Sequence, residues 1–184
     1  ISVYGSTTGS RLYHSRIVHN RVGDGAGGGV GINRGIGENC IGMYNRAKSG
    51  GGINNSEGTI KNCLIAANYA TGSGGGIARN NKSHTIRNCT ITRNEAAGSG
   101  GGIYNQSVTD NNFMNSIIYN NKASDSNDYW GPANAIGYSC APELTDGANG
   151  NLTGNPLFRN PGSGYGLDAT PGDWRLRGSS PCRD

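Results

Sequence analysis

The sequence predicts an all-β solenoid, in which one continuous coil of short strands encloses a single core. Glycine accounts for 33 of the 184 residues, about two and a half times its usual share of ~7%. An asparagine at the end of a strand-like segment recurs at positions 20, 45, 68, 94 and 121, and a triple glycine recurs at 27–29, 50–52, 74–76 and 100–102. Regular repeats of this kind are typical of solenoids, in which each unit packs only against its neighbours.

The contents of the repeat exclude other common solenoids. The Leu-x-x-Leu-x-Leu signature of leucine-rich repeats is absent. Helical repeats are longer and do not tolerate three consecutive glycines within a unit. What remains is one turn of short strands per repeat, with successive turns stacked at the ~4.8 Å spacing of paired strands. We expect about seven coils of 23–27 residues, counting partial ones.

The recurring asparagines stand where a strand ends and the chain must turn. Asparagine tolerates the left-handed backbone conformation, and its amide can bond both the turn and the equivalent asparagine of the next coil. The Ile, Val and Leu side chains of the same units should point inward and build a core that no single repeat could bury alone. We therefore expect a ladder formed by Asn20, Asn45, Asn68, Asn94 and Asn121.

Three of the five cysteines, Cys40, Cys63 and Cys89, occupy one repeat position. Stacked positions have parallel Cα–Cβ directions, which suit a disulfide poorly, and a free thiol packs as a small apolar group. We expect these three to form a buried ladder of free thiols. Cys140 and Cys182 lie in the irregular C-terminal region. We expect them to form a disulfide that clamps the last turns, as in an exported protein.

The same blocks resemble a known family. The pattern Asn-Cys-x-Ile-x-x-Asn-x-Ala, followed by Gly-Gly-Gly-Ile, runs through residues 88–103 and, with small changes, through 62–77. The tail contains Asn-Pro-Leu-Phe, Asp-Trp-Arg-Leu and Ser-Pro-Cys-Arg-Asp segments. These features resemble the right-handed parallel β-helix repeat proteins of bacterial secreted and cell-surface type, in the pectate-lyase-like solenoid superfamily. The resemblance implies the fold. It does not choose a function, because the architecture serves polysaccharide lyases, hydrolases, adhesins and inert surface rods alike.

Residues 1–184 are expected to form one β-helix domain, because no linker interrupts them. Regular coils should span residues 1–121, and irregular coils and loops residues 122–184. Ile1 stands at the position that follows a triple glycine in the other repeats, and neither end carries the polar cap that solenoids need. We therefore expect a segment of a longer protein, or a unit whose ends stack against partners or against copies of itself.

No catalytic set can be named from the sequence. Glycosidases need two carboxyl groups roughly 5–10 Å apart, but the 12 acidic residues are scattered and do not recur at one repeat position. Asp125, Asp128 and Asp146 lie in loop segments that suit either simple turns or a Ca²⁺ site, and no other cofactor is expected. Among the Asn-x-Ser/Thr triplets, Asn105 and Asn151 stand in loop-like contexts and are the candidates for N-glycosylation.

The charge pattern limits the possible partners. The net charge is +4, but the chain has no basic stripe interleaved with aromatic residues, so nucleic-acid binding is not expected. It also has no apolar run of the ~18 residues that a membrane-spanning helix needs. The mild positive charge is compatible with attraction to acidic glycans or an anionic cell surface, and equally with a merely solvated surface.

Together these features favour an extracellular structural or adhesive module, on a cell surface or in a filament-like assembly, and not an enzyme. The alternative is a carbohydrate-active β-helix: a polysaccharide lyase, a hydrolase or a glycan-binding module. A binding site should lie within residues 122–172, where the repeat breaks. Tyr129 and Trp130, and Trp174 just beyond, could form an aromatic surface for sugars or cover a small loop core.

Overall fold

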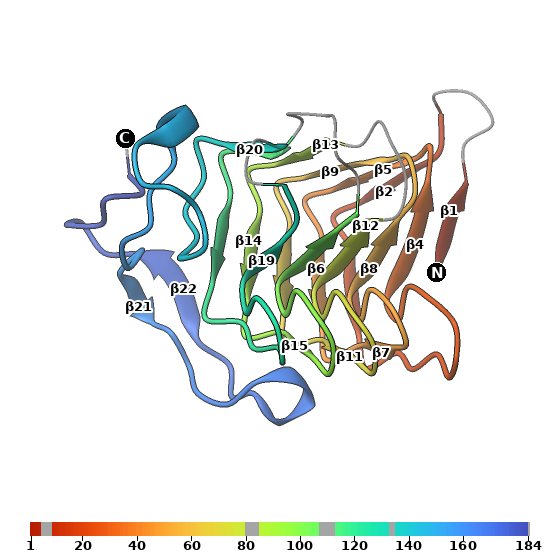
Figure 1. Cartoon of the computed structure of the whole chain (residues 1–184). Coiled ribbons are helices and arrows are strands. Elements are labelled where there is room, and N and C mark those ends of the chain that lie inside the picture. Colours follow the sequence, from red (N-terminus) through yellow and green to blue (C-terminus); the bar gives the residue numbers. More distant parts are fainter. Residues whose placement is uncertain (5–8, 80–84, 107–112, 133–134, 184) are drawn as a thin grey trace.

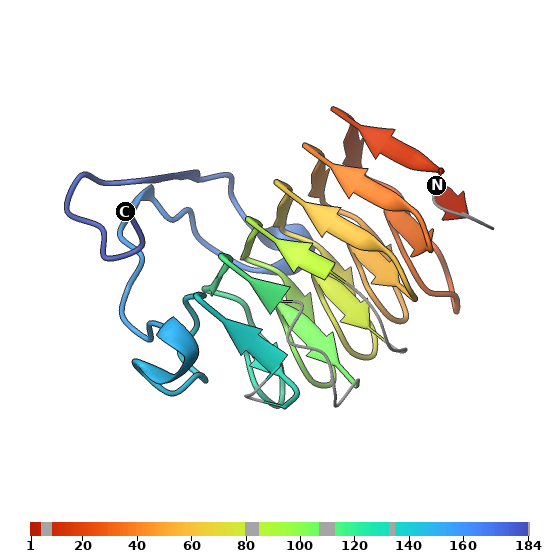
Figure 2. The same cartoon turned by 90° about the horizontal axis from the view of Figure 1, so that it is seen from above.

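The computed structural model describes residues 1–4, 9–79, 85–106, 113–132 and 135–183. It is a parallel β-solenoid, with successive turns of the chain stacked along one axis from the N-terminal to the C-terminal end (Figures 1 and 2). The described part of the solenoid has about five turns, fewer than the seven expected from the repeat count. The difference arises at the C-terminal end, where the chain leaves the coil and forms an antiparallel pair of strands instead of further turns.

Four walls formed by the described residues enclose the core, and each regular turn passes through sheets A, B, C and D in that order. Sheet A contains β1 (Ser2–Tyr4), β4 (Val30–Asn33), β8 (Ile53–Asn55), β12 (Ile77–Arg79), β16 (Ile103–Asn105) and β19 (Tyr129–Trp130). Sheet B contains β2 (Arg11–Tyr13), β5 (Ile36–Glu38), β9 (Thr59–Lys61), β13 (Thr85–Arg87), β17 (Phe113–Met114) and β20 (Ile136–Gly137).

Sheets C and D are smaller. Sheet C contains β3 (Arg16–Val18), β6 (Ile41–Met43), β10 (Leu64–Ala66), β14 (Thr90–Thr92) and β18 (Ile117–Tyr119). Sheet D contains β7 (Arg46–Ala47), β11 (Tyr69–Ala70) and β15 (Glu95–Ala96). Parallel pairing continues through β19 and β20, so sheets A and B extend beyond residue 121, the boundary expected for the regular coils. The antiparallel pair at the C-terminal end joins β21 (Phe158–Asn160) to β22 (Asp173–Leu176).

The core consists of columns of apolar side chains stacked in register. In sheet A, for example, Ile53, Ile77 and Ile103 are partners in successive strands, and all three are buried. Burying an isoleucine side chain stabilises the fold by about 1.5–3 kcal/mol. Each column therefore gains its stability from the neighbouring turns. The columns in sheets A, B and C are Val30, Ile53, Ile77 and Ile103; Ile60, Ile86, Phe113 and Ile136; and Ile65, Ile91 and Ile118.

The asparagine ladder lies between sheets C and D. Asn68 is fully buried, and its Oδ1 accepts hydrogen bonds from the main-chain N–H and the Nδ2 of Asn45, both at 3.0 Å. Its own Nδ2 donates to Oδ1 of Asn94 at 2.9 Å. The same bonds join Asn20 to Asn45 and Asn94 to Asn121. The ladder therefore satisfies buried polar groups of every turn that it crosses.

The triple glycines are required by close packing next to this ladder. The first glycine of each triplet has a left-handed backbone, with φ between 62° and 74° at Gly27, Gly50, Gly74 and Gly100. The third glycine lies against the asparagine of its neighbouring turn: a Cβ at Gly76 would stand 3.0 Å from Asn94 Nδ2 and 2.6 Å from the carbonyl oxygen of Gly102. A side chain at the third position would therefore displace the ladder.

The second ladder also lies where it was expected. Cys40, Cys63 and Cys89 are buried free thiols, and each Sγ donates to the carbonyl oxygen two residues earlier at 3.2 Å. Ser116 and Ser139 continue the column, because the N–H of Cys89 donates to Ser116 Oγ and the N–H of Ser116 donates to Ser139 Oγ. Small side chains at this position thus serve as acceptors and packing groups of successive turns.

Candidate functional site

The asparagine ladder ends at Asp128. The backbone of Asp128 takes the place that the third glycine takes in earlier turns: its carbonyl accepts the N–H of Ile103 at 2.9 Å, as the carbonyl of Gly102 accepts that of Ile77. Its Oδ1 accepts hydrogen bonds from the N–H and the Nδ2 of Asn121, both at 2.8 Å. Asp128 therefore supplies from within its own turn the acceptor that the next asparagine would otherwise provide.

Burial dominates the electrostatics of Asp128. The residue is 5% exposed, and burial raises the pKa of its carboxyl to about 7, against the opposing effect of the bonds from Asn121. The nearby carboxylate of Glu143 acts in the same direction as burial. Glu143 itself is exposed, and its Oε1 accepts the main-chain N–H of Asp128 at 2.8 Å. Around neutral pH, the last turn thus contains one protonatable buried carboxyl beside one exposed carboxylate.

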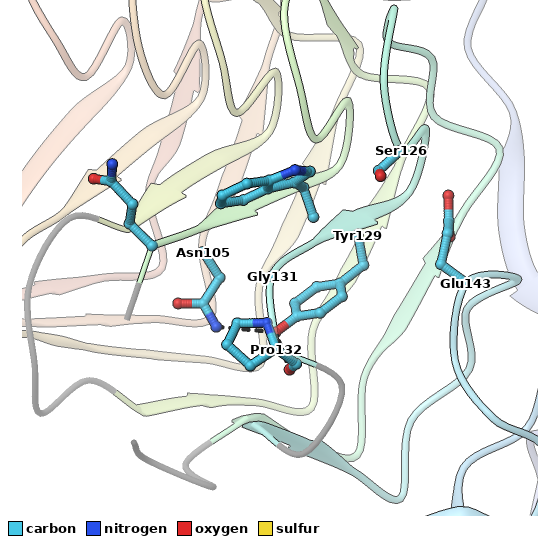
Figure 3. Close-up of a pocket in the computed structure, with 8 residues that line it drawn as sticks. Asn105, Ser126, Tyr129, Gly131, Pro132 and Glu143 are labelled. Carbon is cyan, nitrogen blue, oxygen red and sulfur yellow. Dashed lines mark hydrogen bonds between the residues drawn. The ribbon is translucent and has the colours of Figure 1, made fainter. Parts of the chain in front are cut away.

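Next to this terminus, a pocket of about 430 Å³ opens over the C-terminal end of sheet A (Figure 3). In Figure 3, Asn105, Tyr129 and Pro132 are grouped together, whereas Ser126 and Glu143 stand apart from them. The lining of the pocket combines aromatic, amide, hydroxyl and carboxylate groups: Asn105, Gln106, Ser126, Tyr129, Trp130, Gly131, Pro132 and Glu143.

An aromatic pair forms the outer surface at this pocket. Tyr104 and Trp130 are partners in the parallel strands β16 and β19, so their side chains leave the same face of the sheet. Their rings are stacked, with centroids 4.5 Å apart and an interplanar angle of 17°. Both residues are partly exposed. A preorganised aromatic pair therefore borders the pocket, in which one face of each ring is covered by the other ring.

Tyr129 has a structural role in the same strand. It points into the core and is 4% exposed, its hydroxyl donates to the carbonyl of Pro132 at 3.0 Å, and it accepts from Asn105 Nδ2 at 2.9 Å. Burial raises the pKa of Tyr129, which keeps the phenol protonated as a donor. These bonds hold the Gly131–Pro132 segment and shape the floor of the pocket.

The three aspartates considered for calcium do not converge. Asp125 is exposed and accepts from Ser99 Oγ at 3.3 Å, whereas Asp146 accepts from the N–H and Oγ1 of Thr153 at 3.1 and 3.3 Å. Asp128 is enclosed in the ladder. Within the described ranges, no group of three or more His, Cys, Asp or Glu residues could hold a metal ion. The structure thus places these carboxylates as separate turn and ladder groups.

The expected disulfide between Cys140 and Cys182 is not formed, and both residues are free thiols. They do meet at the C-terminal end of the coil, where both line a cavity of about 390 Å³. A hydrogen bond from Cys140 lowers the pKa of the Cys182 thiol to about 7, and the same interaction raises the pKa of Cys140. The sulfur of Cys140 lies 3.2 Å from the carbonyl oxygen of Gly154, which is a second acceptor within reach of its single S–H. The two cysteines therefore interact as thiols, and the disulfide prediction is corrected on this point.

Neither candidate glycosylation residue is exposed. Asn105 and Asn151 are 1% and 2% exposed. Asn151 accepts the N–H of Ser139 at 3.0 Å and donates to the carbonyl of Ile136 at 3.1 Å. It thereby ends the cysteine and serine column much as Asp128 ends the asparagine ladder. The loop-like sequence around Asn151 predicted an exposed residue, and it gave no sign of this structural role.

Sequence reasoning identified Trp130 but missed Tyr104, Gln106 and Glu143. One signal was available for Asp128: residues 126–128 follow the Gly100–Gly102 triplet by one normal repeat length. Ser126 even retains the left-handed backbone of the first glycine, with φ of 52°. Aligning the repeat through this turn would have placed an aspartate at the third glycine position.

Comparison with known proteins agrees with this geometry. A sequence model of the family described as "Right handed beta helix region" matches residues 1–178. The chain belongs to the right-handed β-helix family. No curated protein and no solved structure matches the chain, so among these comparisons the family model carries the assignment of this β-helix. Among the described residues, no helix is long and apolar enough to cross a membrane.

Proposed function

We propose that this β-helix is an extracellular adhesive module that binds carbohydrate, without cleaving it, at the pocket beside Trp130. The observation that carries the proposal is the stacked Tyr104–Trp130 pair at the edge of a polar pocket. Sugar rings present apolar C–H faces that pack on aromatic rings, and their hydroxyls bond to surrounding polar groups. Trp and Tyr combine a large apolar face with a polar group and are suited to such surfaces.

The polar lining suits this ligand class. Gln106 offers both a donor and an acceptor, Ser126 a hydroxyl, and Glu143 acceptor oxygens. Each belongs to the last turn or its flanking loops, where the regular repeat ends. Because Trp130 is held in register by β16 and Tyr129 is anchored from inside, little side-chain order has to be created on binding.

The extracellular and adhesive parts of the proposal are supported by the sequence pattern. A low-charge, glycine- and asparagine-rich coil of this kind resembles bacterial surface solenoids, and a rod of rigid turns suits a spacer or adhesive role. The partners would be glycans, the rest of a longer chain, or copies of the same β-helix.

A glycan array probed with labelled protein, followed by titration calorimetry of the glycans that bind, tests this proposal. Trp130→Ala should weaken binding at least tenfold, because it removes one ring of the stacked pair. Tyr138→Ala is the matched control: Tyr138 is 66% exposed and lies outside this pocket, so its removal should leave binding unchanged. Absence of any glycan ligand, or equal affinity of Trp130→Ala and the unmodified chain, would overturn the proposal.

A catalytic alternative is favoured by one observation, the protonatable carboxyl of Asp128 beside Glu143. Glycosidases use a raised-pKa acid and a second carboxylate. However, Asp128 does not line the pocket, and its carboxyl is engaged in the ladder. Incubation with acidic and neutral polysaccharides, with and without Ca²⁺, should therefore produce no shorter chains. Cleavage that is lost in Glu143→Gln would support the enzyme and exclude the non-catalytic role.

A further inference from the structure

We propose that Cys140 and Cys182 together bind one soft metal ion of the Cu(I) class at the C-terminal end of the coil. The two thiols share a hydrogen bond, and both line a cavity of about 390 Å³. This cavity has no lining residue in common with the Trp130 pocket. The inference therefore does not depend on the proposed function of that pocket.

Cys140 is held in place by the coil. Its main-chain N–H donates to the carbonyl of Ser116 at 2.9 Å, and its own carbonyl accepts the N–H of Ile118 at 2.8 Å. Cys140 is also the partner of Ile117 in a parallel β-bridge. Ile118, the residue after Ile117, points into the core, and successive side chains of a strand point to opposite faces. The Cys140 thiol therefore lies on the outer side of sheet C.

Cys182 reaches this thiol through a turn of the C-terminal segment. Ser180 is buried, its Oγ donates to the carbonyl of Pro156 at 2.6 Å, and the same Oγ accepts the main-chain N–H of Cys182 at 3.1 Å. Figures 1 and 2 show the C-terminus at the end of the coil that lies opposite the N-terminus. Both cysteines are thus positioned by main-chain contacts, so little order has to be created when an ion binds.

The number of ligands selects the metal. Zinc in proteins takes about three or four side-chain ligands, and calcium takes about six to eight oxygens. Within the described ranges, no further His, Cys, Asp or Glu residue completes a group of three around the two thiols. Cu(I) is a soft ion that thiolates select, and two sulfurs in a linear arrangement satisfy its coordination. The pair of thiols therefore suits Cu(I) better than Zn²⁺ or Ca²⁺.

The meeting of two unbonded sulfurs also suits a bridging ion. A disulfide requires sulfurs about 2.05 Å apart, and this bond is not formed. An ion between two thiolates holds the sulfurs about 4.6 Å apart, twice a bond of the ~2.3 Å length found for zinc and sulfur. On binding, Cu⁺ forms two bonds to sulfur, the protons of the two thiols pass to solvent, and no group is oxidised or reduced. The ion thereby replaces the proton that the two sulfurs share.

The cavity gives an ion access to this pair of thiols, and access distinguishes the pair from the cysteine ladder. Cys182 is partly exposed, whereas Cys40, Cys63 and Cys89 are buried and donate to main-chain carbonyls. Soft ions prefer sulfur to neutral amides and hydroxyls, so the two sulfurs should supply the coordination. The other polar side chains that line the cavity are amides and hydroxyls: Asn88, Asn115, Ser116, Tyr138 and Ser139.

Anaerobic titration of the whole chain with Cu(I), in competition with the chelator bicinchoninate, tests the inference. One equivalent of Cu(I) should bind, and Zn²⁺ in a separate chelator competition should bind at least tenfold more weakly. Cys140→Ser and Cys182→Ser should each weaken Cu(I) binding at least tenfold. Cys89→Ser is the matched control, because serine occupies the same column at Ser116 and Ser139, and this variant should bind Cu(I) like the unmodified chain.

The inference would be overturned if Cys182→Ser bound Cu(I) like the unmodified chain, if only Cys89→Ser lost binding, or if Zn²⁺ bound as tightly as Cu(I). Cys182 is partly exposed, so Cys182→Ser decides the question even where Cys140→Ser does not fold, and an unchanged amide spectrum shows that its fold is kept. Trp130→Ala should keep its affinity for Cu(I), so this inference and the proposed function can fail independently.

Discussion

The carboxyl oxygen Oδ1 of Asp128 accepts two hydrogen bonds from Asn121, one from the main-chain N–H and one from the side-chain amide, both at 2.8 Å. The asparagines that precede Asn121 in the ladder are bonded differently. The main-chain N–H of each donates to the amide oxygen of the asparagine one turn further on. Asp128 thus closes the polar column inside the solenoid, with a group whose protonation changes near neutral pH.

Asp128→Ala should destabilise the β-helix, because it leaves the buried N–H of Asn121 without its acceptor. The expected loss is about 1–3 kcal/mol in the free energy of unfolding, measured by urea denaturation at about pH 4, where the carboxyl is largely protonated. Asp128→Asn retains an acceptor oxygen at the same place and should unfold like the unmodified chain at this pH. Equal stability of all three proteins would contradict the role of Asp128 as the ladder terminus.

The pH dependence of stability should also depend on Asp128. Its pKa is about 7 in the folded state, raised from 3.8 mainly by burial. A raised pKa means that the folded state favours the protonated carboxyl, so this contribution is complete below about pH 4 and is lost as pH rises through 7. Asp128→Asn mimics the protonated form and should be more stable than the unmodified chain at pH 8, and this difference should shrink as the pH falls and vanish below about pH 4. Parallel pH profiles for the two proteins would exclude this mechanism.

Asn68→Ala should be among the most damaging single changes in the ladder. It removes the acceptor of two bonds from Asn45 and donors to Gly42, Ala66 and Asn94. We expect a loss of about 3 kcal/mol or more, since several buried groups lose partners together. Asn62→Gly is the control, because Asn62 is exposed and its backbone has a φ of 53°, which glycine adopts without strain. The change should cost about 0.5 kcal/mol or less. The free energies of unfolding of the two variants are measured by thermal and urea unfolding. Equal losses in the two variants would contradict the special role of Asn68.

Gly76→Ala should destabilise the chain for a steric reason. The new Cβ would meet the carbonyl oxygen of Gly102 at 2.6 Å and Asn94 Nδ2 at 3.0 Å, so backbone and ladder would have to shift, at a cost of about 1–3 kcal/mol. Gly23→Ala places its Cβ where nothing lies within 4 Å and should be close to neutral. Denaturant midpoints that fall in the reverse order would contradict this packing argument.

Cys182 should be the most reactive thiol of the folded chain. Its pKa is lowered to about 7 by the hydrogen bond from Cys140, and it is partly exposed, whereas the other four cysteines are buried. Brief alkylation with iodoacetamide at pH 7, followed by peptide mass spectrometry, should label Cys182 first. Cys40, Cys63 and Cys89 should react only after unfolding. Early labelling of the ladder cysteines would show that this part of the core is open.

Much of the fold was predictable because each turn places the same residue types at equivalent positions. The spacing of Asn45, Asn68 and Asn94 predicted their stacking, and the position shared by Cys40, Cys63 and Cys89 predicted a buried column. The number of turns was predicted less well, since the residues after Cys140 no longer follow the repeat. The pairing of Cys140 with Cys182 was predicted as a disulfide, whereas the two thiols meet without forming the bond.

The candidate sites were only partly predictable. Trp130 stood out as an aromatic residue where the period breaks, but its partner Tyr104 lies a full repeat earlier, in an otherwise regular strand. Register across adjacent strands, and not sequence proximity, brings the two rings together. Glu143 reaches the same pocket from a loop whose path has no periodic signal.

The amino-acid sequence by itself determines the coil: its period, its inward-facing isoleucines, and its asparagine and cysteine columns can all be predicted from the repeat. Nearest-neighbour packing of similar units makes these features visible as repeats. The return of the C-terminal segment to the coil is visible in the folded chain alone, where Arg93 binds the carbonyls of Pro161 and Gly162. That return places Leu167 in the same cavity as Arg21, although the two residues come from opposite ends of the sequence. Such contacts depend on the shape of the finished coil and on hydrogen bonds to main-chain carbonyls, which any residue can supply and which therefore leave no pattern in the sequence.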